Sequence, residues 1–244
     1  MADYDTEEEF LKHYNVRQYD LPLATVDMAI FTVQDQQLQV LLVKRALHPA
    51  KGQWALPGGF IDMKKDQSLS DTAYRKLKEK TGVDTPYLEQ VATFGNASRD
   101  PRGWSLTVSY FALISSDQTT LSMDSRSEEV AWVPVTQVGE LELAFDHEQI
   151  LQACHERLRA KVQYTSVPVN LMPEVFTLVE LQKTFEIILG SPIEKKSFRR
   201  RIADADILEE TGEMKSGPSR PAKLYRVKNK GENYFFTRLM EGAR

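Results

Sequence analysis

Apolar residues in the first half of the chain gather in short runs that are typical of β-strands. Two runs rich in Val, Ile and Leu, residues 25–33 and 38–45, flank the polar turn 34–37, and this arrangement predicts a β-hairpin. Further strands are predicted at residues 88–94, 106–114 and 130–135.

Between these strands, residues 68–81 show the spacing of an amphipathic helix. Its apolar positions are Leu69, Ala73 and Leu77. Ser68 and Asp71 stand at its start with the spacing of a capping box, in which each side chain accepts a hydrogen bond from the other residue's backbone. We therefore expect the helix to begin directly after Ser68.

A second helix is predicted over residues 146–162, where apolar residues again recur at helical spacing. The only cysteine, Cys154, falls on the apolar face of this helix. We interpret it as a small core residue and not as a reactive thiol, because no base flanks it in the sequence. Strands mixed with helices in this way predict an α+β domain.

The C-terminal part of the chain follows a seam at 164–176 that contains two prolines and little periodicity. A helix is predicted over residues 177–189, ended by Gly190, and Ser191 is expected to cap a second helix over residues 194–206. Two strands follow at residues 207–211 and 223–228. The expected parts are thus an acidic arm (1–20), a first domain (21–163), a linker (164–176) and a second domain (177–244).

The distribution of charge supports this division. The 244 residues carry a formal net charge of -4 and a pI near 5.7, which would argue against a nucleic-acid partner. Residues 1–150 hold 14 Lys and Arg against 23 Asp and Glu, a net charge of -9, whereas residues 151–244 hold 17 against 12, a net charge of +5. This reversal of sign indicates two domains with different partners.

Composition excludes several classes of protein. The apolar runs are far shorter than the roughly 20 residues that span a bilayer, and the acidic N-terminus lacks the apolar segment of a signal peptide. Four scattered histidines and one cysteine offer neither a zinc pattern nor an internal disulfide. We therefore expect a cytoplasmic protein without a metal, a cofactor or a membrane partner.

Residues 54–62, Trp-Ala-Leu-Pro-Gly-Gly-Phe-Ile-Asp, followed by the helix at 68–81, resemble the Nudix box of diphosphate hydrolases. The positions that match the box are Gly59, Arg75, Leu77 and Gly82. The resemblance implies that the first domain is a Nudix-like α/β/α sandwich. It also implies that the ligand site includes Gly58, Gly59 and Phe60.

Most of the carboxylates that give this box its chemistry are missing. Three glutamates at positions i, i+3 and i+4 of the helix hold divalent cations in the family, and here these positions are Lys76, Glu79 and Lys80. Gln67 aligns with an earlier glutamate. A charged lysine cannot donate an electron pair to Mg²⁺. We therefore predict a vestigial box, including Arg75, that has no catalytic activity and in which Glu79 forms an ion pair.

The loop at 94–104 is a second candidate ligand site. Arg99 and Arg102 can present guanidinium groups to phosphate or ribose oxygens, and Trp104 offers an aromatic face to a base. Turn chemistry alone would also explain the Asp-Pro and Arg-Gly pairs of this loop. Arg-Asp-Pro-Arg-Gly in this place resembles the ADP-ribose type of Nudix domain, and this resemblance favours the ligand site.

Residues 143–147, Leu-Ala-Phe-Asp-His, resemble another segment of those Nudix domains. The resemblance adds Asp146 and His147 to the predicted ligand site. The alternative for His147 is an exposed residue at the start of a helix.

The helix at 194–206 has one apolar side and strongly basic remaining faces. With the preceding helix and a short turn it fits the second helix of a helix-turn-helix, although a solvated cationic face is the alternative. The hairpin that follows resembles the wing of a winged helix-turn-helix and favours DNA binding. The predicted DNA-binding residues are Lys195, Lys196, Ser197, Arg199, Arg200, Arg201, Lys215, Arg220 and Lys223.

Together these features resemble the NrtR family of Nudix-related transcriptional regulators of NAD metabolism. The resemblance covers nearly the whole chain, including Phe-Arg-Arg-Arg at 198–201 and Arg-Pro-Ala-Lys-Leu-Tyr-Arg at 220–226. It implies a bacterial, nucleoid-associated homodimer that represses genes of NAD biosynthesis or salvage. It further implies double-stranded operator DNA as partner and ADP-ribose as effector, with the diphosphate near Arg99 and Arg102.

Two other functions stay open on the sequence alone. The first is a Mg²⁺-dependent ADP-ribose pyrophosphatase whose C-terminal domain serves dimerisation. The second is a small-molecule-binding adaptor without affinity for DNA, which the charge of +5 and the predicted wing disfavour.

Overall fold

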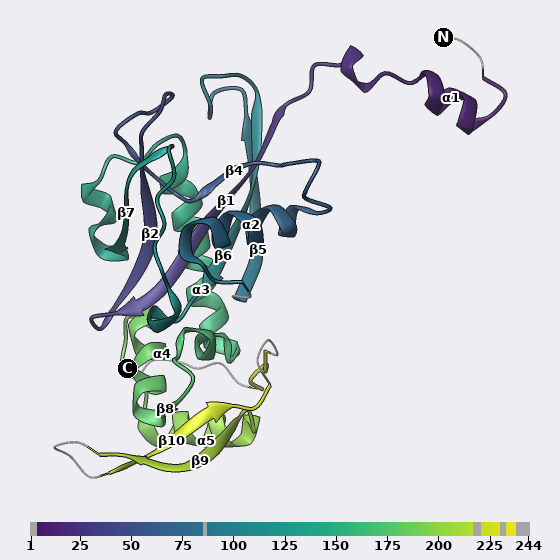
Figure 1. The fold of residues 1–244 in the computed structure, drawn as a ribbon. Coiled ribbons are helices and arrows are strands. Elements are labelled where there is room, and N and C mark those ends of the chain that lie inside the picture. Colours follow the sequence, from purple (N-terminus) through teal and green to yellow (C-terminus); the bar gives the residue numbers. More distant parts are fainter. Residues whose placement is uncertain (1–3, 85–86, 217–220, 230–232, 238–244) are drawn as a thin grey trace.

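A long hairpin organises the N-terminal domain in the computed structural model, which describes residues 4–84, 87–216, 221–229 and 233–237 (Figure 1). β1 (Leu23–Gln34) and β2 (Gln37–Arg45) pair antiparallel through a tight turn at Asp35 and Gln36, both with positive φ. The predicted hairpin is confirmed.

Around this hairpin lies a mixed sheet of seven strands. Its order is β3-β2-β1-β6-β5, with β4 paired to β1 and β7 paired to β2. β1 runs parallel to β6, and the other pairs are antiparallel. The bounds are β3 (Trp54–Ala55), β4 (Gly58–Phe60), β5 (Tyr87–Asn96), β6 (Ser105–Leu113) and β7 (Ser127–Pro134). The three further strands predicted from the apolar runs are β5, β6 and β7.

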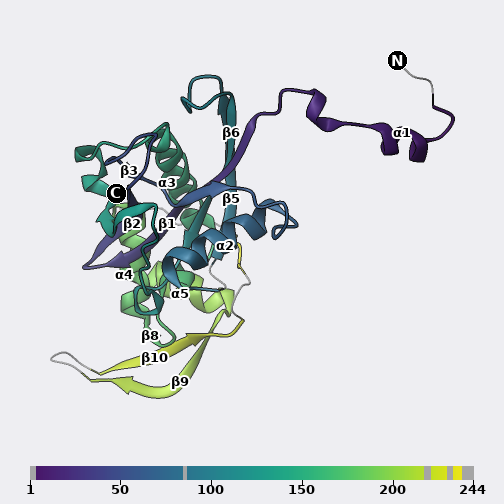
Figure 2. The same cartoon turned by 45° about the horizontal axis from the view of Figure 1, so that its top comes forward.

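Helices cover both faces of this sheet (Figures 1 and 2). Val26, Met28 and Ile30 of β1 share a core with α2 (Leu69–Thr81), whereas Ala29 and Phe31 share a core with α3 (His147–Tyr164). Successive side chains of a strand point to opposite faces, so a strand covered on both sides must be apolar at nearly every position. The predicted Nudix-like α/β/α sandwich is confirmed.

The helices of this domain begin and end as their sequences indicate. Ser68 Oγ accepts a hydrogen bond from Asp71 N at 3.2 Å, and the Asp71 carboxylate accepts one from Ser68 N at 2.8 Å, so the predicted capping box is present. Gly82 ends α2 in a left-handed conformation that glycine adopts without strain. Cys154 is fully buried on α3, and burial raises the pKa of its thiol to about 12, which fits a core residue.

The C-terminal domain is a winged helix at the end of the molecule opposite α1 (Figure 1). Two helices precede a hairpin, and a three-stranded sheet forms in the order β8-β10-β9. The bounds are β8 (Phe176–Thr177), α4 (Leu178–Leu189), α5 (Lys195–Ala205), β9 (Leu208–Lys215) and β10 (Ala222–Val227). The predicted winged helix-turn-helix is confirmed.

The cap of α5 differs from the prediction. Glu194, and not Ser191, is the N-cap residue, and its carboxylate accepts hydrogen bonds from the N–H groups of Lys196 and Ser197 at 2.8 and 2.7 Å. The reason lies in the turn, where α4 holds the backbone of Ile193: Glu186 accepts from its N–H at 2.9 Å and Gln182 donates to its carbonyl at 3.0 Å. The helix therefore starts only after this anchored residue.

The segment 164–176, expected as a linker, is largely buried between the two domains. It contains a short 3-10 helix (Val167–Leu171), and Val167 belongs to one continuous apolar cluster with Phe111 of the sheet and Phe185 of α4. α3 also packs directly against α4. The N-terminal domain and the winged domain therefore share a core, which connects them directly.

The N-terminal arm leaves the body of the molecule before β1 (Figures 1 and 2). Its helix α1 (Glu7–His13) and its 3-10 helix (Val16–Gln18) contain no buried residue. Two more 3-10 helices lie at Ser116–Gln118 and Val135–Glu140. In the part of the chain that the structure describes, no helix combines the length and the apolar character needed to cross a membrane.

Candidate ligand cleft and nucleic-acid interface

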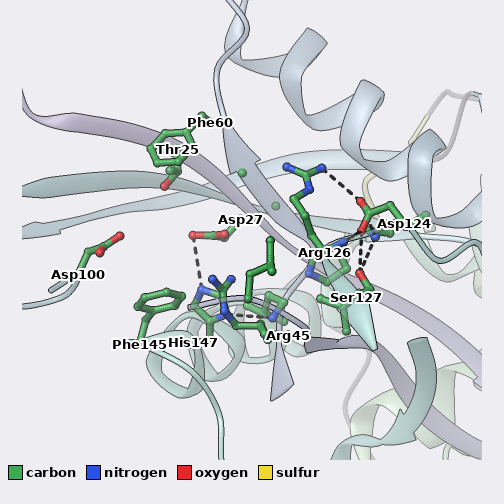
Figure 3. A pocket seen from close by; sticks show the side chains of 18 of the residues that line it. Thr25, Asp27, Arg45, Phe60, Asp100, Asp124, Arg126, Ser127, Phe145 and His147 are labelled. Atoms are coloured by element: carbon green, nitrogen blue, oxygen red, sulfur yellow. Dashed lines mark hydrogen bonds and ion pairs between the residues drawn. The ribbon is translucent and has the colours of Figure 1, made fainter. Parts of the chain in front are cut away.

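A cleft of about 270 Å³ opens on the N-terminal domain beside β1, β2 and β4 (Figure 3). Its charged lining residues are Asp27, Arg45, Lys80, Arg99, Asp100, Arg102, Asp124 and Arg126. Five of these side chains are cationic and three are carboxylates, although residues 1–150 as a whole carry a net charge of -9. Such a local excess of positive charge in a concave site favours an anionic ligand.

The two glycines of the predicted site shape the floor of the cleft. A Cβ atom on Gly58 would come within 2.2 Å of Asp27 Oδ1 and 2.3 Å of the Val26 carbonyl, so only glycine lets β4 approach β1 this closely. Gly59 has a φ of 147°, a value that side-chain-bearing residues rarely adopt. Gly58, Gly59 and Phe60 all line the cleft, as the Nudix resemblance implies.

Arg99 lies in the cleft wall but is already bound to carboxylates. It is 8% exposed, and its Nε and Nη2 atoms donate to the two carboxylate oxygens of Asp146 at 2.8 and 2.7 Å. Asp27 lies 3.7 Å from Nη2. Burial disfavours the charged form of Arg99, yet its hydrogen bonds to Asp146 raise its pKa. Asp146 therefore fixes the orientation of Arg99, a role that the sequence did not reveal.

Arg102 forms an ion pair with Asp100 of its own loop, whereas the partner of Arg99 is distant in the sequence. Its Nε and Nη2 atoms donate to Asp100 at 3.0 and 2.6 Å, and these hydrogen bonds raise the pKa of Arg102 and lower that of Asp100. The guanidinium carbon lies 5.1 Å from the centre of the Phe60 ring, within the range of a cation–π interaction. Phe60 and Arg102 thus form one wall of the cleft.

His147 is buried and not an exposed residue at a helix start. It is the first residue of α3, is 4% exposed and lines the cleft. Its Nδ1 atom accepts a hydrogen bond from Leu56 N at 2.9 Å, and Nε2 faces Asp27 at 3.8 Å. Burial lowers the pKa of His147. Because Nδ1 accepts, the proton of the neutral ring lies on Nε2 and points toward Asp27.

The structure does not place Trp104 in the cleft. Its side chain is 51% exposed and is absent from the lining of the cleft. Its carbonyl accepts a hydrogen bond from Leu23 N at 3.0 Å, which joins the loop to β1. Phe145 and Phe60 supply aromatic surface instead (Figure 3). The stacking of a base on Trp104 stays a prediction.

The helix α2, which carries the Nudix-like positions 75–80, is held by ion pairs. Lys76 Nζ lies 2.9 Å from Glu79, and Arg75 binds Glu79 at 3.2 Å, so the predicted ion pair of Glu79 is confirmed. Arg75 also forms a bidentate pair with Asp66 at 2.8 and 2.5 Å, whereas Gln67 is exposed. The carboxylate next to the helix is thus Asp66, because the loop is one residue longer than the pattern that aligns Gln67.

The cationic residues of α5 divide into an exposed group and a half-buried one. Phe198, Ile202 and Ala205 face the core. Within the described ranges, none of the exposed cations has a carboxylate within ion-pair distance; these are Lys195, Lys196, Arg199 and Arg200. Arg201 and Ser197 are half-buried. The helix therefore presents a row of uncompensated positive charge to an anionic partner such as DNA.

Comparisons with known proteins assign both domains. Residues 23–154 match the NUDIX domain, and residues 168–227 match the NrtR DNA-binding winged helix domain. A curated relative from Acinetobacter baylyi, named ADPR responsive transcriptional repressor NtrR, is 50% identical over 243 residues, covering 100% of this chain and 97% of the relative. The chain belongs to the NrtR family.

Solved structures of an NrtR from Shewanella oneidensis agree with this assignment. The chain in complex with a 27mer DNA is 48% identical with a TM-score of 0.82, covering 89% of this chain and 99% of that one. Its NUDIX domain in complex with ADP ribose is 50% identical with a TM-score of 0.59, covering 63% of this chain and 99% of that one. The predicted family and the order of its two domains are confirmed.

In this NrtR-family wing, the described basic residues are paired. Lys215 contacts Glu180 at 2.5 Å, and Lys223 contacts Glu210 at 2.8 Å. Arg226 and Lys228 pair likewise with Glu209 and Asp206. Arg220, also predicted to bind DNA, lies outside the described residues. Lys215 and Lys223 must therefore exchange a carboxylate for a phosphate if they contact DNA.

Glu210→Gln is expected to release Lys223 and to strengthen DNA binding at low salt. Each additional phosphate contact steepens the dependence of log K on log salt by about 0.9, so the slope should change by roughly that amount. Fluorescence anisotropy of a labelled duplex over a salt series measures it. Glu213→Gln removes the same charge from β9, where the described part of the chain shows no ion pair for Glu213. Equal slopes for the two variants would contradict the expected role of Glu210.

Several cleft residues were missed by the sequence analysis. Arg45 ends β2, Asp124 and Arg126 precede β7, and Phe145 precedes α3. Phe145 has a positive φ of 58°. Phe145 lies in the motif at 143–147 but was not singled out there, and Arg45, Asp124 and Arg126 belong to no motif. The apolar pattern of residues 38–45 does not reveal that Arg45 faces a cleft. Only the pairing of β2 with its neighbours places these side chains together.

Proposed function

We propose that this chain is a transcriptional repressor of NAD biosynthesis or salvage genes that binds ADP-ribose in the Nudix cleft and releases operator DNA in response. The observation that carries the proposal is a cleft with a cationic excess on a domain that shares an apolar core with a winged helix. In the described part of the chain, Lys195, Lys196, Arg199 and Arg200 of α5 in that winged helix have no ion-pair partner. The name of the Acinetobacter relative and the ADP ribose complex of the Shewanella domain support the same ligand.

The helix α3 supplies a physical connection between the two sites. His147 at its first turn lines the cleft, and Arg159 near its other end donates to the carbonyl of Leu189 at 3.1 Å. Leu189 is the last residue of α4 in the helix-turn-helix. A ligand that shifts α3 therefore acts directly on the element that precedes the recognition helix. The shift alters DNA affinity only if the ligand favours a geometry that no longer fits the operator.

Two copies of the chain would bind one operator. Symmetric dimers place two recognition helices about one helical turn apart, which matches a pseudo-palindromic site. In this proposal the protein is a cytoplasmic homodimer that associates with the nucleoid when it is bound to DNA. It is not a hydrolase, because Lys76 and Lys80 take the places of carboxylates and Glu79 is bound by two cations.

A titration of operator complexes with ADP-ribose tests the proposal. Anisotropy of a labelled fragment from the chain's own upstream region is expected to show DNA affinity falling by about 5–150-fold at saturating ADP-ribose, the range of a typical allosteric coupling. AMP and ribose 5-phosphate serve as control ligands. An unchanged operator affinity would contradict the effector assignment. Release of AMP from ADP-ribose with Mg²⁺ would instead support the pyrophosphatase.

A further inference from the structure

The metal ions of Nudix domains do not fit the residues of this cleft. Of the three helix positions that hold metal in the family, only Glu79 is a carboxylate, and it is bound by Lys76 at 2.9 Å and Arg75 at 3.2 Å. Among the described residues, no group of three or more His, Cys, Asp or Glu side chains is arranged to hold a metal ion. A diphosphate in this cleft therefore needs counter-charges of another kind.

We propose that Lys80 and Arg45 supply those counter-charges, so that the cleft binds the diphosphate of ADP-ribose without a divalent cation. This inference rests on the proposed function, because it takes ADP-ribose as the ligand. It assigns to Lys80 a binding role at a position where the Nudix box has a metal-binding carboxylate.

Lys80 is held in a fixed place in the cleft wall. Its side chain is 10% exposed, and its Nζ atom lies 2.9 Å from Ser127 Oγ and 3.1 Å from Asp124 Oδ2. Asp124 also binds Arg126 at 3.2 Å, so one carboxylate positions two cations. Figure 3 shows Asp124, Arg126 and Ser127 grouped at one end of the cleft, away from Asp100 and Phe60. A preorganised ammonium group is a good partner for phosphate oxygens because little side-chain entropy is lost on binding.

Arg45 is the lining cation that lacks a carboxylate partner. Its Nε atom donates to the carbonyl of Pro49 at 2.9 Å, and its guanidinium carbon lies 5.0 Å from the centre of the Phe145 ring. Across the described residues, no Asp or Glu lies within 4 Å of it as an ion-pair partner. Burial, together with the neighbouring Arg102, lowers the pKa of Arg45. A half-buried cation that lacks an ion-pair partner gains most from an anionic ligand.

The balance of charge in the cleft agrees with this assignment. Five Lys and Arg side chains line it against three Asp side chains, and Asp146, which pairs with Arg99, adds a fourth carboxylate, so one positive charge is left in excess. A diphosphate diester carries one negative charge on each of its phosphates, so its charge is opposite in sign to this excess. Arg99 and Arg102, the residues predicted to hold the diphosphate, are already neutralised by Asp146 and Asp100. The uncompensated charge thus belongs to Arg45 and to the group of Lys80 and Arg126 around Asp124.

Calorimetric titration of the full chain with ADP-ribose tests the proposal, once in EDTA and once in millimolar Mg²⁺. The two dissociation constants are expected to agree within about twofold. Lys80→Met and Arg45→Met should each weaken binding by about tenfold or more in EDTA, the usual cost of removing a charged hydrogen-bond donor. Arg45→Lys, which keeps the charge, should retain more affinity than Arg45→Met. Lys78→Met is the matched control, because Lys78 lies on the same helix with its side chain 59% exposed.

The outcomes separate this proposal from the proposed function. Binding that requires Mg²⁺ overturns the metal-free assignment, and binding that both Met variants leave intact overturns the roles of Lys80 and Arg45. Either result leaves ADP-ribose as effector. No ADP-ribose binding to the unmodified chain in either buffer overturns the effector assignment together with this inference. Thermal melts of each variant without ligand report the folded fraction. The comparison of Arg45→Lys with Arg45→Met supplies the test if Lys80→Met does not fold.

Discussion

Phe198→Ala is expected to lower the free energy of unfolding by about 3–5 kcal/mol, the usual cost of deleting a buried phenylalanine ring. Phe198 is fully buried on α5, and its ring centre lies 5.3 Å from that of Phe185 on α4 in an edge-to-face arrangement. The same apolar cluster continues through Val167 to Phe111 of the sheet. The substitution therefore leaves a cavity at the point where the recognition helix attaches to the rest of the protein.

Chemical denaturation followed by circular dichroism measures the effect. Because the two domains share a core, we expect the unfolding transition of both to move together. Val179→Ala is the control, since Val179 lies on α4 with 56% of its surface exposed and should change stability by less than about 0.5 kcal/mol. A loss below about 1 kcal/mol for Phe198→Ala would mean that α5 is not anchored by this pair of rings.

Arg199→Ala and Arg200→Ala are each expected to weaken operator binding by about 1–3 kcal/mol if the side chain reads a base. Both side chains are exposed on α5, and neither has an ion-pair partner among the residues that the structure describes. No carboxylate must therefore be displaced when they meet DNA. This contrasts with Lys215 and Lys223 of the wing, which give up contacts to Glu180 and Glu210.

Measuring the affinity of each variant for the operator and for an unrelated duplex over a salt series shows whether Arg199 and Arg200 contact bases or phosphates. Loss of a base contact reduces affinity for the operator alone, whereas loss of a phosphate contact weakens both complexes and lowers the salt slope by about 0.9. Lys64→Ala removes one exposed charge from the Nudix domain and controls for the change in net charge. Unchanged operator affinity in both arginine variants would exclude α5 as the reading helix.

Local patterns in the sequence predicted much of the fold. The hairpin at 25–45, the capping box of α2 and the two helices of the winged domain were all visible, because alternation and helical spacing report which face of an element is buried. The N-cap of α5 was predicted at Ser191, but the structure has it at Glu194. That error arose because the side chains of Gln182 and Glu186 anchor the turn, and a contact across the turn leaves no local signal.

The ligand site depended on contacts between distant residues. Arg99 and Asp146 are 47 residues apart in the sequence, as are Lys80 and Ser127. Their meeting depends on the order of the strands and on the parallel pairing of β1 with β6. The motif around Arg99 therefore indicated the region of the cleft. It did not indicate that Asp146 already neutralises Arg99 while Arg45 keeps a free charge.

The sequence by itself determined that an acidic domain with a Nudix-like box precedes a basic winged helix, because residue types and their spacing carry that information directly. Only the tertiary structure decided which cations are free for a ligand. Charge is a property of each residue, but its compensation is a property of pairs, and pairs such as Lys223 with Glu210 form only when separate strands come into register. Because of such pairing, the described basic residues of the wing and Arg99 have carboxylate partners, whereas Arg45 and the exposed cations of α5 have none among the described residues.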